Sequence, residues 1–298
     1  MQVREKRSEK EFSRLIENGI KDFVARDPGN RLPSFENEPI FDEPLVGFAA
    51  GDDSIFQDYK KIIGEFHLTP REALNKHLKI KGIKESPEHV SVISWILPIS
   101  HDTRLTNRAE TSLGSLRWNH TRWQGQGFAF SLANHIVLLL GEMGYHAVVM
   151  EMADFYERFE VNNGRVSNWS QRHIAYAAGL GTFSLNDGFI TSKGIAMRVY
   201  SIITDAKLSP SPRTYKNHLS NCLFYNDWNC RRCIERCPVG AITEQGHDKI
   251  KCREFLTKTQ WDIVKQEGRG GYIGDYVGCG LCQTKVPCES RIPSIPVK

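Results

Sequence analysis

The stretch Cys230-Arg-Arg-Cys233-Ile-Glu-Arg-Cys237-Pro238 decides how this 298-residue chain is interpreted. It lies within a segment, residues 222–288, that contains all eight cysteines of the protein. The other five are Cys222, Cys252, Cys279, Cys282 and Cys288. Thiolates are soft, anionic ligands that suit iron-sulfur clusters, zinc or copper rather than hard cations. The segment is therefore a candidate metal-binding domain.

The spacing favours two iron-sulfur clusters. Cys-x2-Cys-x3-Cys-Pro ends the cysteine run of bacterial ferredoxins, in which the cysteine before the proline binds the other cluster of a pair. Eight cysteines supply two complete sets of four. By this crossing rule we predict that one 4Fe-4S cluster, cluster one, is bound by Cys222, Cys230, Cys233 and Cys288. Cluster two would be bound by Cys237, Cys252, Cys279 and Cys282.

Two other interpretations compete. Structural zinc could use the two Cys-x2-Cys pairs, but it would leave four cysteines and the Cys-Pro signature unexplained. Disulfides need an oxidising compartment, and the first twenty residues lack the apolar core of a secretory signal. The segment also departs from the compact ferredoxin pattern, because seven residues separate Cys222 from Cys230 and five separate Cys282 from Cys288. Both departures concern cluster one.

Composition is that of a soluble globular protein. The net charge of +4 and the pI near 8.6 are far from those of a dedicated nucleic-acid-binding protein. No apolar run approaches the roughly 18 residues that a membrane-spanning helix requires. We therefore expect no contact with a membrane and a cytoplasmic location, where free thiolates and oxygen-sensitive clusters persist.

The rest of the chain reads as an α/β core. Helical periodicity predicts helices over 9–25, 127–144 and 170–178, and β-branched apolar runs predict strands over 90–99, 145–150, 189–191 and 197–204. The order strand, helix, strand between 90 and 150 suggests at least one crossover unit. The polar segment 101–120 is either a loop over a ligand site or a solvated surface loop.

Two glycines follow the helix at 170–178. Gly179 and Gly181 remove side chains where the backbone could approach a ligand closely, although a helix end and turn without a ligand explain them equally well. They do not form the dinucleotide-binding fingerprint, because a helix rather than a strand precedes them and a third glycine is missing. A nicotinamide cofactor is not expected here.

Three features together resemble the epoxyqueuosine reductase and reductive dehalogenase superfamily. They are the run Arg172-His-Ile-Ala-Tyr-Ala-Ala-Gly-Leu-Gly181, the strand sequences Gly188-Phe-Ile-Thr191 and Tyr200-Ser-Ile-Ile-Thr-Asp205, and the cysteine segment, in which Lys251-Cys-Arg-Glu-Phe-Leu256 supplies the isolated cysteine. The similarity extends from about residue 90 to residue 288. Proteins of this superfamily are cobalamin-dependent iron-sulfur enzymes.

The resemblance implies a fold of the α/β (α+β) class. An N-terminal helical and extended region (1–88) would pack on a corrinoid-binding core of nitroreductase-like type (89–210), followed by a ferredoxin-like domain with two clusters (211–298). A base-off corrinoid, cobalamin, would lie between core and cluster domain and receive single electrons from the clusters. By the same resemblance, its ring would contact Gly179, Leu180, Gly181, Thr182, Asn186, Thr191 and Met197.

The resemblance fails at the expected proton donor. Epoxyqueuosine reductases carry an acid thirteen residues before the alanine of Ala-Gly-Leu-Gly, and Arg165 stands there; Leu185 departs from both subfamilies, which have lysine or arginine at its position. Reductive chemistry still needs a proton source. Within the segment between 150 and 170 the candidates are Asp154, Tyr156, Glu157 and Arg165, each of which could equally be a solvated surface residue.

These observations predict an oxidoreductase, a cobalamin- and cluster-dependent reductase whose substrate is either a small molecule or a tRNA. Its electron donor would be a low-potential ferredoxin or flavodoxin. Two alternatives remain, an electron-transfer iron-sulfur protein without a corrinoid and a reductive activator of a partner protein's corrinoid.

Overall fold

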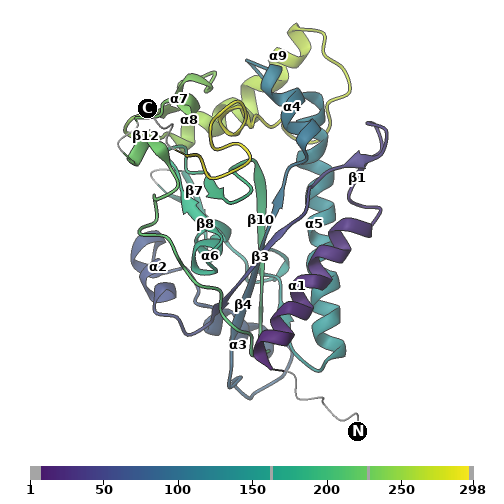
Figure 1. The fold of residues 1–298 in the computed structure, drawn as a ribbon, viewed down its shortest axis with the longest axis vertical. Coiled ribbons are helices and arrows are strands. Elements are labelled where there is room, and N and C mark those ends of the chain that lie inside the picture. Colours follow the sequence, from purple (N-terminus) through teal and green to yellow (C-terminus); the bar gives the residue numbers. More distant parts are fainter. Residues whose placement is uncertain (1–7, 162–163, 227–228, 295–298) are drawn as a thin grey trace.

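A computed structural model describes residues 8–161, 164–226 and 229–294, so residues 1–7 of the predicted N-terminal region lie outside it. Figure 1 shows an upright sheet in the middle of the molecule, with long helices beside it and the cysteine segment at one end. The mixture of helices and strands agrees with the predicted α/β (α+β) class.

The central sheet has four strands in the order β3-β4-β10-β5. They span Leu45–Ala50, Ser91–Pro98, Met197–Thr204 and Ala147–Val148. Every pair of neighbours is antiparallel, and β4 pairs with β10 along its whole length, from Met197 opposite Pro98 to Thr204 opposite Ser91. Every residue of β4 is buried, as expected for an apolar central strand.

The predicted crossover connection is present, but the two strands that it joins are not neighbours in the sheet. Because β10 is antiparallel to both β4 and β5, those two strands run in the same direction with β10 between them. The chain passes from β4 to β5 through α4 (His101–Ala109) and the long helix α5 (Leu116–Glu142). The last strand of the core, β10, thus fills the gap that the crossover leaves.

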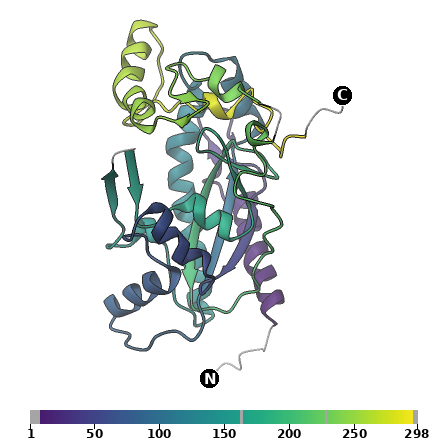
Figure 2. The same cartoon turned by 90° about the vertical axis from the view of Figure 1, so that its left-hand side faces the viewer.

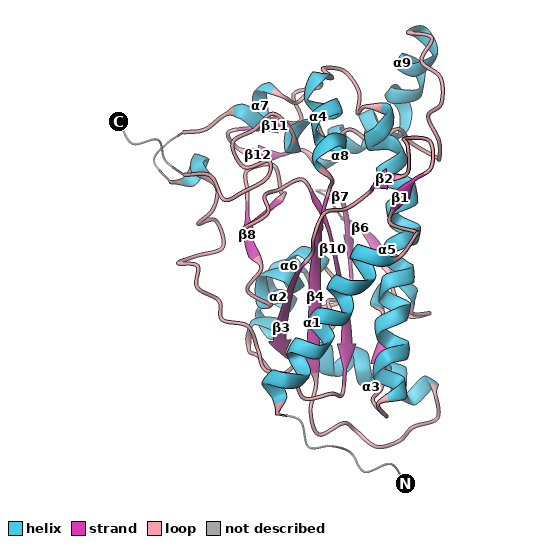
Figure 3. Ribbon diagram, turned by 45° about the vertical axis from the view of Figure 1, so that its right-hand side comes forward, coloured by secondary structure: helices cyan, strands magenta, loops and turns pink. Residues whose placement is uncertain are grey.

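Helices cover both faces of the sheet. On one face α1 (Glu9–Arg26) and α5 lie side by side, and their apolar side chains form one core with Trp95, Tyr200 and Ile202 (Figure 3). On the other face α2 (Ile55–Ile63), α3 (Pro70–Ile80) and α6 (Gln171–Ala177) build a second core around Val92 and Ile203. Alternate residues of the same strands therefore serve two different cores.

The prediction of a loop over 101–120 is wrong. This segment forms α4 and, after a short connection, the first turns of α5, and several of its polar side chains are buried. Thr103, Asn107 and Asn119 are fully buried. Asn107 and Asn119 contact the cysteine segment, so their polarity serves an internal interface.

Smaller elements complete the core. They are β1 (Arg31–Leu32), β2 (Glu38–Pro39), the 3-10 turn η1 (Met150–Met152), β6 (Arg158–Val161), β7 (Gly164–Ser167), β8 (Gly181–Phe183) and β9 (Phe189–Thr191). Figure 2 shows the β6–β7 hairpin projecting beside the sheet, below the cysteine segment.

The cysteine segment is built from short elements. These are η2 (Leu223–Tyr225), α7 (Arg232–Glu235), β11 (Ile242–Thr243), β12 (Gly246–His247), α8 (Lys249–Glu254), the π-helical turn η3 (Phe255–Thr259), α9 (Gln260–Gln266) and η4 (Leu281–Gln283). Such short pieces bury little apolar surface, so the segment depends on other interactions for its order. The three-part division of the chain at 88 and 210 stays a prediction.

Among the described residues, no helix combines the length and apolarity needed to cross a lipid bilayer.

Candidate cluster and cofactor site

The cysteines predicted for cluster one surround a small apolar cavity. Cys222, Cys230, Cys233 and Cys288 all line it, together with Ile190 and Ile195 of the core. Burial, followed by the charge of the neighbouring thiolates of Cys222 and Cys230, raises the pKa of the Cys233 thiol to about 12. Four thiolates this close together would repel one another, and binding to cationic iron would relieve that repulsion. The assignment of these ligands remains a prediction.

The cysteines predicted for cluster two also lie near one another. Burial raises the pKa of Cys279 to about 12, and the charges of Cys252 and Cys237 add to the increase. Burial raises the pKa of Cys282 well above its usual value, and the charges of Cys279, Cys252 and, more weakly, Cys233 of the other set add to the increase. The Ala241 amide donates to Cys237 Sγ over 3.2 Å, which is the kind of contact that tunes a cluster's potential.

The core holds the Cys288 end of the segment through its backbone. The Ile195 amide donates to the Cys288 carbonyl over 2.8 Å, and the Ala196 amide donates to the Glu289 carbonyl over 3.2 Å. A Cβ at Gly194 would lie 2.2 Å from the Glu289 carbonyl oxygen, so this close approach requires glycine. Cys288 is thus attached to the turn that precedes β10.

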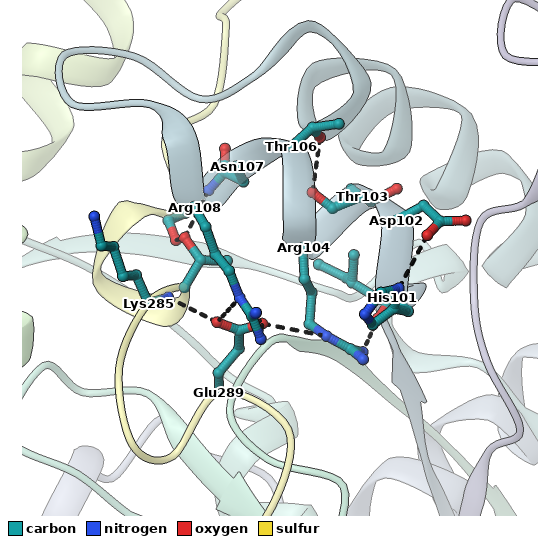
Figure 4. A network of polar contacts seen from close by, with 12 residues as sticks. His101, Asp102, Thr103, Arg104, Thr106, Asn107, Arg108, Lys285 and Glu289 are labelled. Atoms are coloured by element: carbon teal, nitrogen blue, oxygen red, sulfur yellow. Dashed lines mark hydrogen bonds and ion pairs between the residues drawn. The ribbon is translucent and has the colours of Figure 1, made fainter.

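A buried carboxylate ties the same end to α4. Glu289 is 3% exposed, and its carboxylate accepts hydrogen bonds of 2.9 Å from Arg108 Nε and 2.7 Å from the Lys285 amide. Arg104 Nε lies 3.5 Å away, an ion pair rather than a hydrogen bond. Figure 4 shows both arginines of α4 converging on this one carboxylate.

Polar side chains of α4 and α5 hold the Cys279 end. Asn107 Nδ2 donates to Thr284 Oγ1 over 3.0 Å and to the Cys279 carbonyl over 3.3 Å. Asn119 Nδ2 donates to the carbonyls of Ile273 and Val277 over 3.0 and 2.9 Å. These bonds replace the apolar packing that the short elements of the segment lack.

Gly280, between two cysteines predicted for cluster two, gives a test of this packing. Its φ is 63°, and a Cβ there would lie 2.0 Å from the Trp118 ring of α5. We expect Gly280→Ala to destabilise the protein by about 1 kcal/mol from its positive φ and by about 1–3 kcal/mol more from the clash. It should also lower the iron content of reconstituted protein.

Gly82→Ala is the matched control, because Gly82 has a φ of 78° and no atom within 4 Å of the added Cβ. Gly82→Ala should lower stability only by the roughly 1 kcal/mol that comes from its positive φ, and it should leave the iron content unchanged. Equal losses of stability and of iron in the two variants would show that Trp118 does not constrain the segment.

A large cavity separates the core from the cysteine segment. Its volume is about 1110 Å³, above the roughly 300–1,000 Å³ of most small-molecule sites. Its walls include Tyr59, Ile62, His173, Tyr176, Phe183, Leu185, Asp187, Tyr225, His247 and Lys249. Tyr225 lies three residues after Cys222, and His247 and Lys249 lie shortly before Cys252. Both predicted cysteine sets therefore have a member close in sequence to the walls of the large cavity.

A second cavity of about 840 Å³, the cationic cavity, shares Ile62, Arg172, His173 and Lys249 with the larger one. Further basic residues line it: Arg122, Arg158, Arg165 and Arg198. Its one acidic residue among the lining side chains is Glu151 of η1. Burial raises the pKa of Glu151, although Arg158, Arg122 and Arg198 oppose the increase.

Of the seven residues predicted to contact a corrin ring, Met197 lines the cationic cavity and Asn186 lines the cavity of the cluster-one cysteines. Asn186 Nδ2 donates to the Cys282 carbonyl over 2.9 Å. Its neighbours Phe183, Leu185 and Asp187 line the large cavity. The β8–β9 turn thus contacts both cysteine sets and a cofactor-sized space.

The two glycines have a structural role in the fold. A Cβ at Gly179 would lie 2.5 Å from the Pro212 carbonyl oxygen, and one at Gly181 would lie 2.4 Å from the Ile190 carbonyl oxygen. They permit close approach of the chain to itself, as in the plainer of the two interpretations above.

The other predicted ring contacts are also engaged within the protein. Leu180 is buried against Gly47, Thr182 accepts a hydrogen bond of 2.9 Å from the Asn221 amide, and Thr191 donates to the Gly194 carbonyl over 3.0 Å. None of these three lines either large cavity. Their predicted contact with a ring stays untested.

The four candidate proton donors separate into two pairs. Tyr156 and Arg165 line the cationic cavity, and Arg165 is paired with Glu160 over 2.9 Å. Asp154 and Glu157 are exposed and line neither large cavity. The sequence analysis missed Glu151, an acid three to six residues from three of the candidates, because nothing in its local pattern shows that η1 turns it inward.

The alternatives for the cysteines can now be compared with the structure. All eight are free thiols, and no disulfide forms among them. Among the described residues, no three His, Cys, Asp or Glu side chains are grouped closely enough to hold a single metal ion.

Comparison with known families defines the class of the C-terminal segment. Residues 228–288 match the family described as a 4Fe-4S double cluster binding domain. The prediction of iron-sulfur clusters is therefore supported by a match that spans seven of the eight cysteines.

The wider resemblance is also confirmed. The chain is 28% identical over 218 residues to an epoxyqueuosine reductase of Bacillus cereus, covering 72% of this chain and 50% of that protein. It is 27% identical over 146 residues to one of Synechocystis, covering 47% of this chain and 46% of that protein. The chain thus spans about half the length of these curated relatives.

A solved structure of similar fold supports the architecture described above. A catabolic reductive dehalogenase matches with a TM-score of 0.51 at 14% identity, covering 94% of this chain and 37% of that one. A selenomethionine-labelled epoxyqueuosine reductase matches with a TM-score of 0.48 at 17% identity, covering 94% and 66%. At these identities the likeness to the dehalogenase concerns the fold alone.

Proposed function

We propose that this protein is a cytoplasmic oxidoreductase in which two 4Fe-4S clusters supply single electrons to a corrinoid, cobalamin, held in the large cavity. The observation that carries the proposal is the position of that cavity, whose walls come from the core and from residues beside Cys222 and Cys252. Clusters of this type reach potentials down to roughly −700 mV, low enough for a strongly reducing centre. The electron donor would be a low-potential ferredoxin or flavodoxin.

The residues present fit such a cofactor. The cavity is larger than usual and has flat aromatic and apolar walls, Tyr59, Tyr176, Phe183 and Leu185, suited to the face of a macrocycle. Tyr59 is held in place because its hydroxyl donates to the His173 carbonyl over 2.7 Å. When bound, a corrinoid supplies a metal centre that can be reduced to a strong nucleophile or electron donor.

The protein's own residues would then orient the cofactor and exclude water. Asn186 donates to the Cys282 carbonyl, so a hydrogen bond joins the β8–β9 turn at the wall of the cavity to one predicted ligand of cluster two. His173 is held by Ser170 Oγ over 2.8 Å, and burial lowers its pKa to about 3. It therefore faces both cavities as a neutral side chain at physiological pH.

Anaerobic reconstitution with iron, sulfide and cobalamin tests the proposal. Wild-type protein should retain about eight irons and about one cobalt after desalting. Ile62→Glu should lower cobalt retention without loss of iron, because Ile62 borders both cavities and is 68% exposed, so a carboxylate there disturbs the site more than the fold.

Ile80→Glu is the matched control, since Ile80 ends α3 and is 59% exposed. It should change neither metal. About eight irons without cobalt in the wild type would contradict the corrinoid and favour the electron-transfer alternative. Cobalt that is retained only with a second, corrinoid-carrying protein would favour the activator.

The relatives named epoxyqueuosine reductase suggest epoxyqueuosine reduction as one activity. Arg165 stands where those enzymes carry an acid, which argues against assigning the same activity to this chain directly. The choice between a small molecule and a tRNA as substrate depends on what the cationic cavity binds.

A further inference from the structure

The cationic cavity brings together arginines from three elements of the core. Arg198 and Tyr200 are two residues apart on β10 and therefore lie on the same face of the sheet. Arg122 and Gln126 are four residues apart on α5 and face them. Arg158 enters from β6.

None of these three arginines forms an ion pair with an acid among the described residues; Arg122 and Arg158 have the neutral partners Tyr276 and Tyr156, and Arg198 has none. The Arg198 side chain makes no hydrogen bond or ion pair with other residues of the described ranges, and burial lowers its pKa to about 10, so it remains charged at neutral pH. The positive charge of Arg122 repels Arg198. Arg122 itself has a neutral partner, because its Nε donates to Tyr276 Oη over 2.9 Å. A half-buried guanidinium without a partner is costly unless a ligand supplies the anion.

Glu151 forms no ion pair with these arginines among the described residues. Its Oε2 is buried and has no hydrogen-bond partner among the described residues, and no cation comes within ion-pair distance of it there. The cavity thus contains three arginines and an acid that influence one another's pKa without forming an ion pair among the described residues. Such unsatisfied polar groups in a cavity are typical of a binding or catalytic site.

Apolar and aromatic groups complete the walls. Tyr156, Phe189, Met197, Val199 and Tyr200 line the cavity between the charged groups. They provide surface for a flat or apolar body, whereas the arginines provide donors for one end of it.

We propose that the cationic cavity binds a small organic anion, a carboxylate or another oxyanion on an aromatic or apolar body, through Arg122, Arg158 and Arg198. As the substrate class of the reductase this inference rests on the proposed function, whereas the binding itself can be measured without either cofactor. A recessed, partly apolar cavity suits a small molecule better than the extended backbone of a nucleic acid, which needs an exposed basic surface.

Cofactor-free protein is sufficient for the first experiment. Benzoate and its neutral isostere benzamide are titrated by calorimetry and by ligand-observed NMR. Benzoate should bind and benzamide should not, and Arg198→Gln should weaken benzoate binding by about 10-fold to 100-fold, the loss of one charged hydrogen bond. Arg14→Gln, an exposed arginine of α1, is the control that should leave binding unchanged.

Glu151 provides a second, independent measurement. Benzenesulfonate keeps its charge at all working pH values, so its affinity reports the protein's own titration. The groups that face Glu151 are Arg122 from α5, Arg158 from β6, Arg198 and Tyr200 from β10, and Tyr156. Because an anion binds better beside a protonated acid, affinity should fall as pH rises through the raised pKa of Glu151. Glu151→Gln should bind more tightly at alkaline pH and lose this dependence.

The cofactor's own phosphate is the other possible source of an oxyanion. Cobalamin carries a nucleotide phosphate that cobinamide lacks, so the effect of Arg198→Gln on the retention of each distinguishes the sources. Unchanged retention of both supports a substrate site, whereas an equal loss of both would assign Arg198 to the corrin ring and overturn the proposal. A loss confined to cobalamin would assign the arginines to the cofactor and overturn the proposal.

Three further results would overturn it. They are equal binding of benzoate and benzamide, absence of binding of benzoate and benzenesulfonate at millimolar concentration, and binding of a tRNA arm that depends on Arg198 while the small anions do not bind. Failure of cobalt retention with normal anion binding would instead contradict the proposed function alone.

Discussion

Glu289→Ala should lower the free energy of unfolding by about 3–5 kcal/mol, the usual cost of removing one partner of a buried ion pair. The carboxylate is 3% exposed and is the shared partner of Arg104 and Arg108. The side chain of Arg104 is only 10% exposed, so its charge would remain buried beside the site of the lost carboxylate. The 41% exposure of Arg108 places the expected cost toward the lower end.

The same substitution should release iron preferentially from cluster one. Glu289 follows Cys288, and its carboxylate also accepts the Lys285 amide over 2.7 Å, which closes the turn that carries this cysteine. Iron content and the thermal unfolding midpoint are the two measurements, and the midpoint should fall by roughly 5–10 °C.

Two variants make the result interpretable. Glu289→Gln keeps the shape and an acceptor for the Lys285 amide, so it should lose less stability than alanine. Glu17→Ala on α1 removes an exposed i,i+4 partner of Lys21 at 2.8 Å and should cost at most about 0.5 kcal/mol, without loss of iron. A Glu289→Ala variant as stable and iron-rich as Glu17→Ala would show that α4 does not hold the cysteine segment.

The apolar patterns of the sequence predicted three strands of the central sheet, β4, β5 and β10, but not the edge strand β3. The run at 90–99 became β4, the run at 197–204 became β10, and the helix over 9–25 became α1. The apolar residues of α1 face one core and therefore recur at helical spacing, whereas β4 and β10 serve both cores and read as continuous apolar runs.

The start of α5 could not be predicted in this way. The helix begins at Leu116, eleven residues before the predicted start, because its first turns face the cysteine segment rather than an apolar core. Asn119 donates to two carbonyls of that segment and His120 Nε2 lies 2.9 Å from the Gly271 carbonyl oxygen. A polar helix face that is buried against another segment has the same composition as a solvent-exposed face. Only the position of the cysteine segment in the structure shows that this face of α5 is buried.

The cationic cavity escaped prediction for a related reason. Arg122, Glu151 and Arg198 are far apart in sequence and belong to a helix, a short turn and a strand. None forms a motif with its neighbours. The cysteines were different, because their chemistry limits the possible ligands so strongly that spacing alone gave a testable grouping.

That grouping leads to the second large effect. Cys237→Ser should remove cluster two, about four of about eight irons, although Cys237 lies only four residues from Cys233 of cluster one. The charges that act on the Cys279 thiol come from Cys252 and Cys237, and those that act on Cys233 come from Cys222 and Cys230. The cysteine before the proline therefore lies with residues distant in sequence.

Double variants separate the crossed assignment from a sequential one. If Cys237 and Cys252 bind one cluster, the double variant Cys237→Ser/Cys252→Ser should retain about four irons, no fewer than either single variant. Cys237→Ser combined with Cys230→Ser should lose both clusters. Anaerobic iron counts, with electron paramagnetic resonance of the reduced protein to identify the cluster that remains, distinguish the cases. Retention of four irons by the Cys237/Cys230 pair and none by the Cys237/Cys252 pair would reverse the assignment, since adjacent cysteines would then share a cluster.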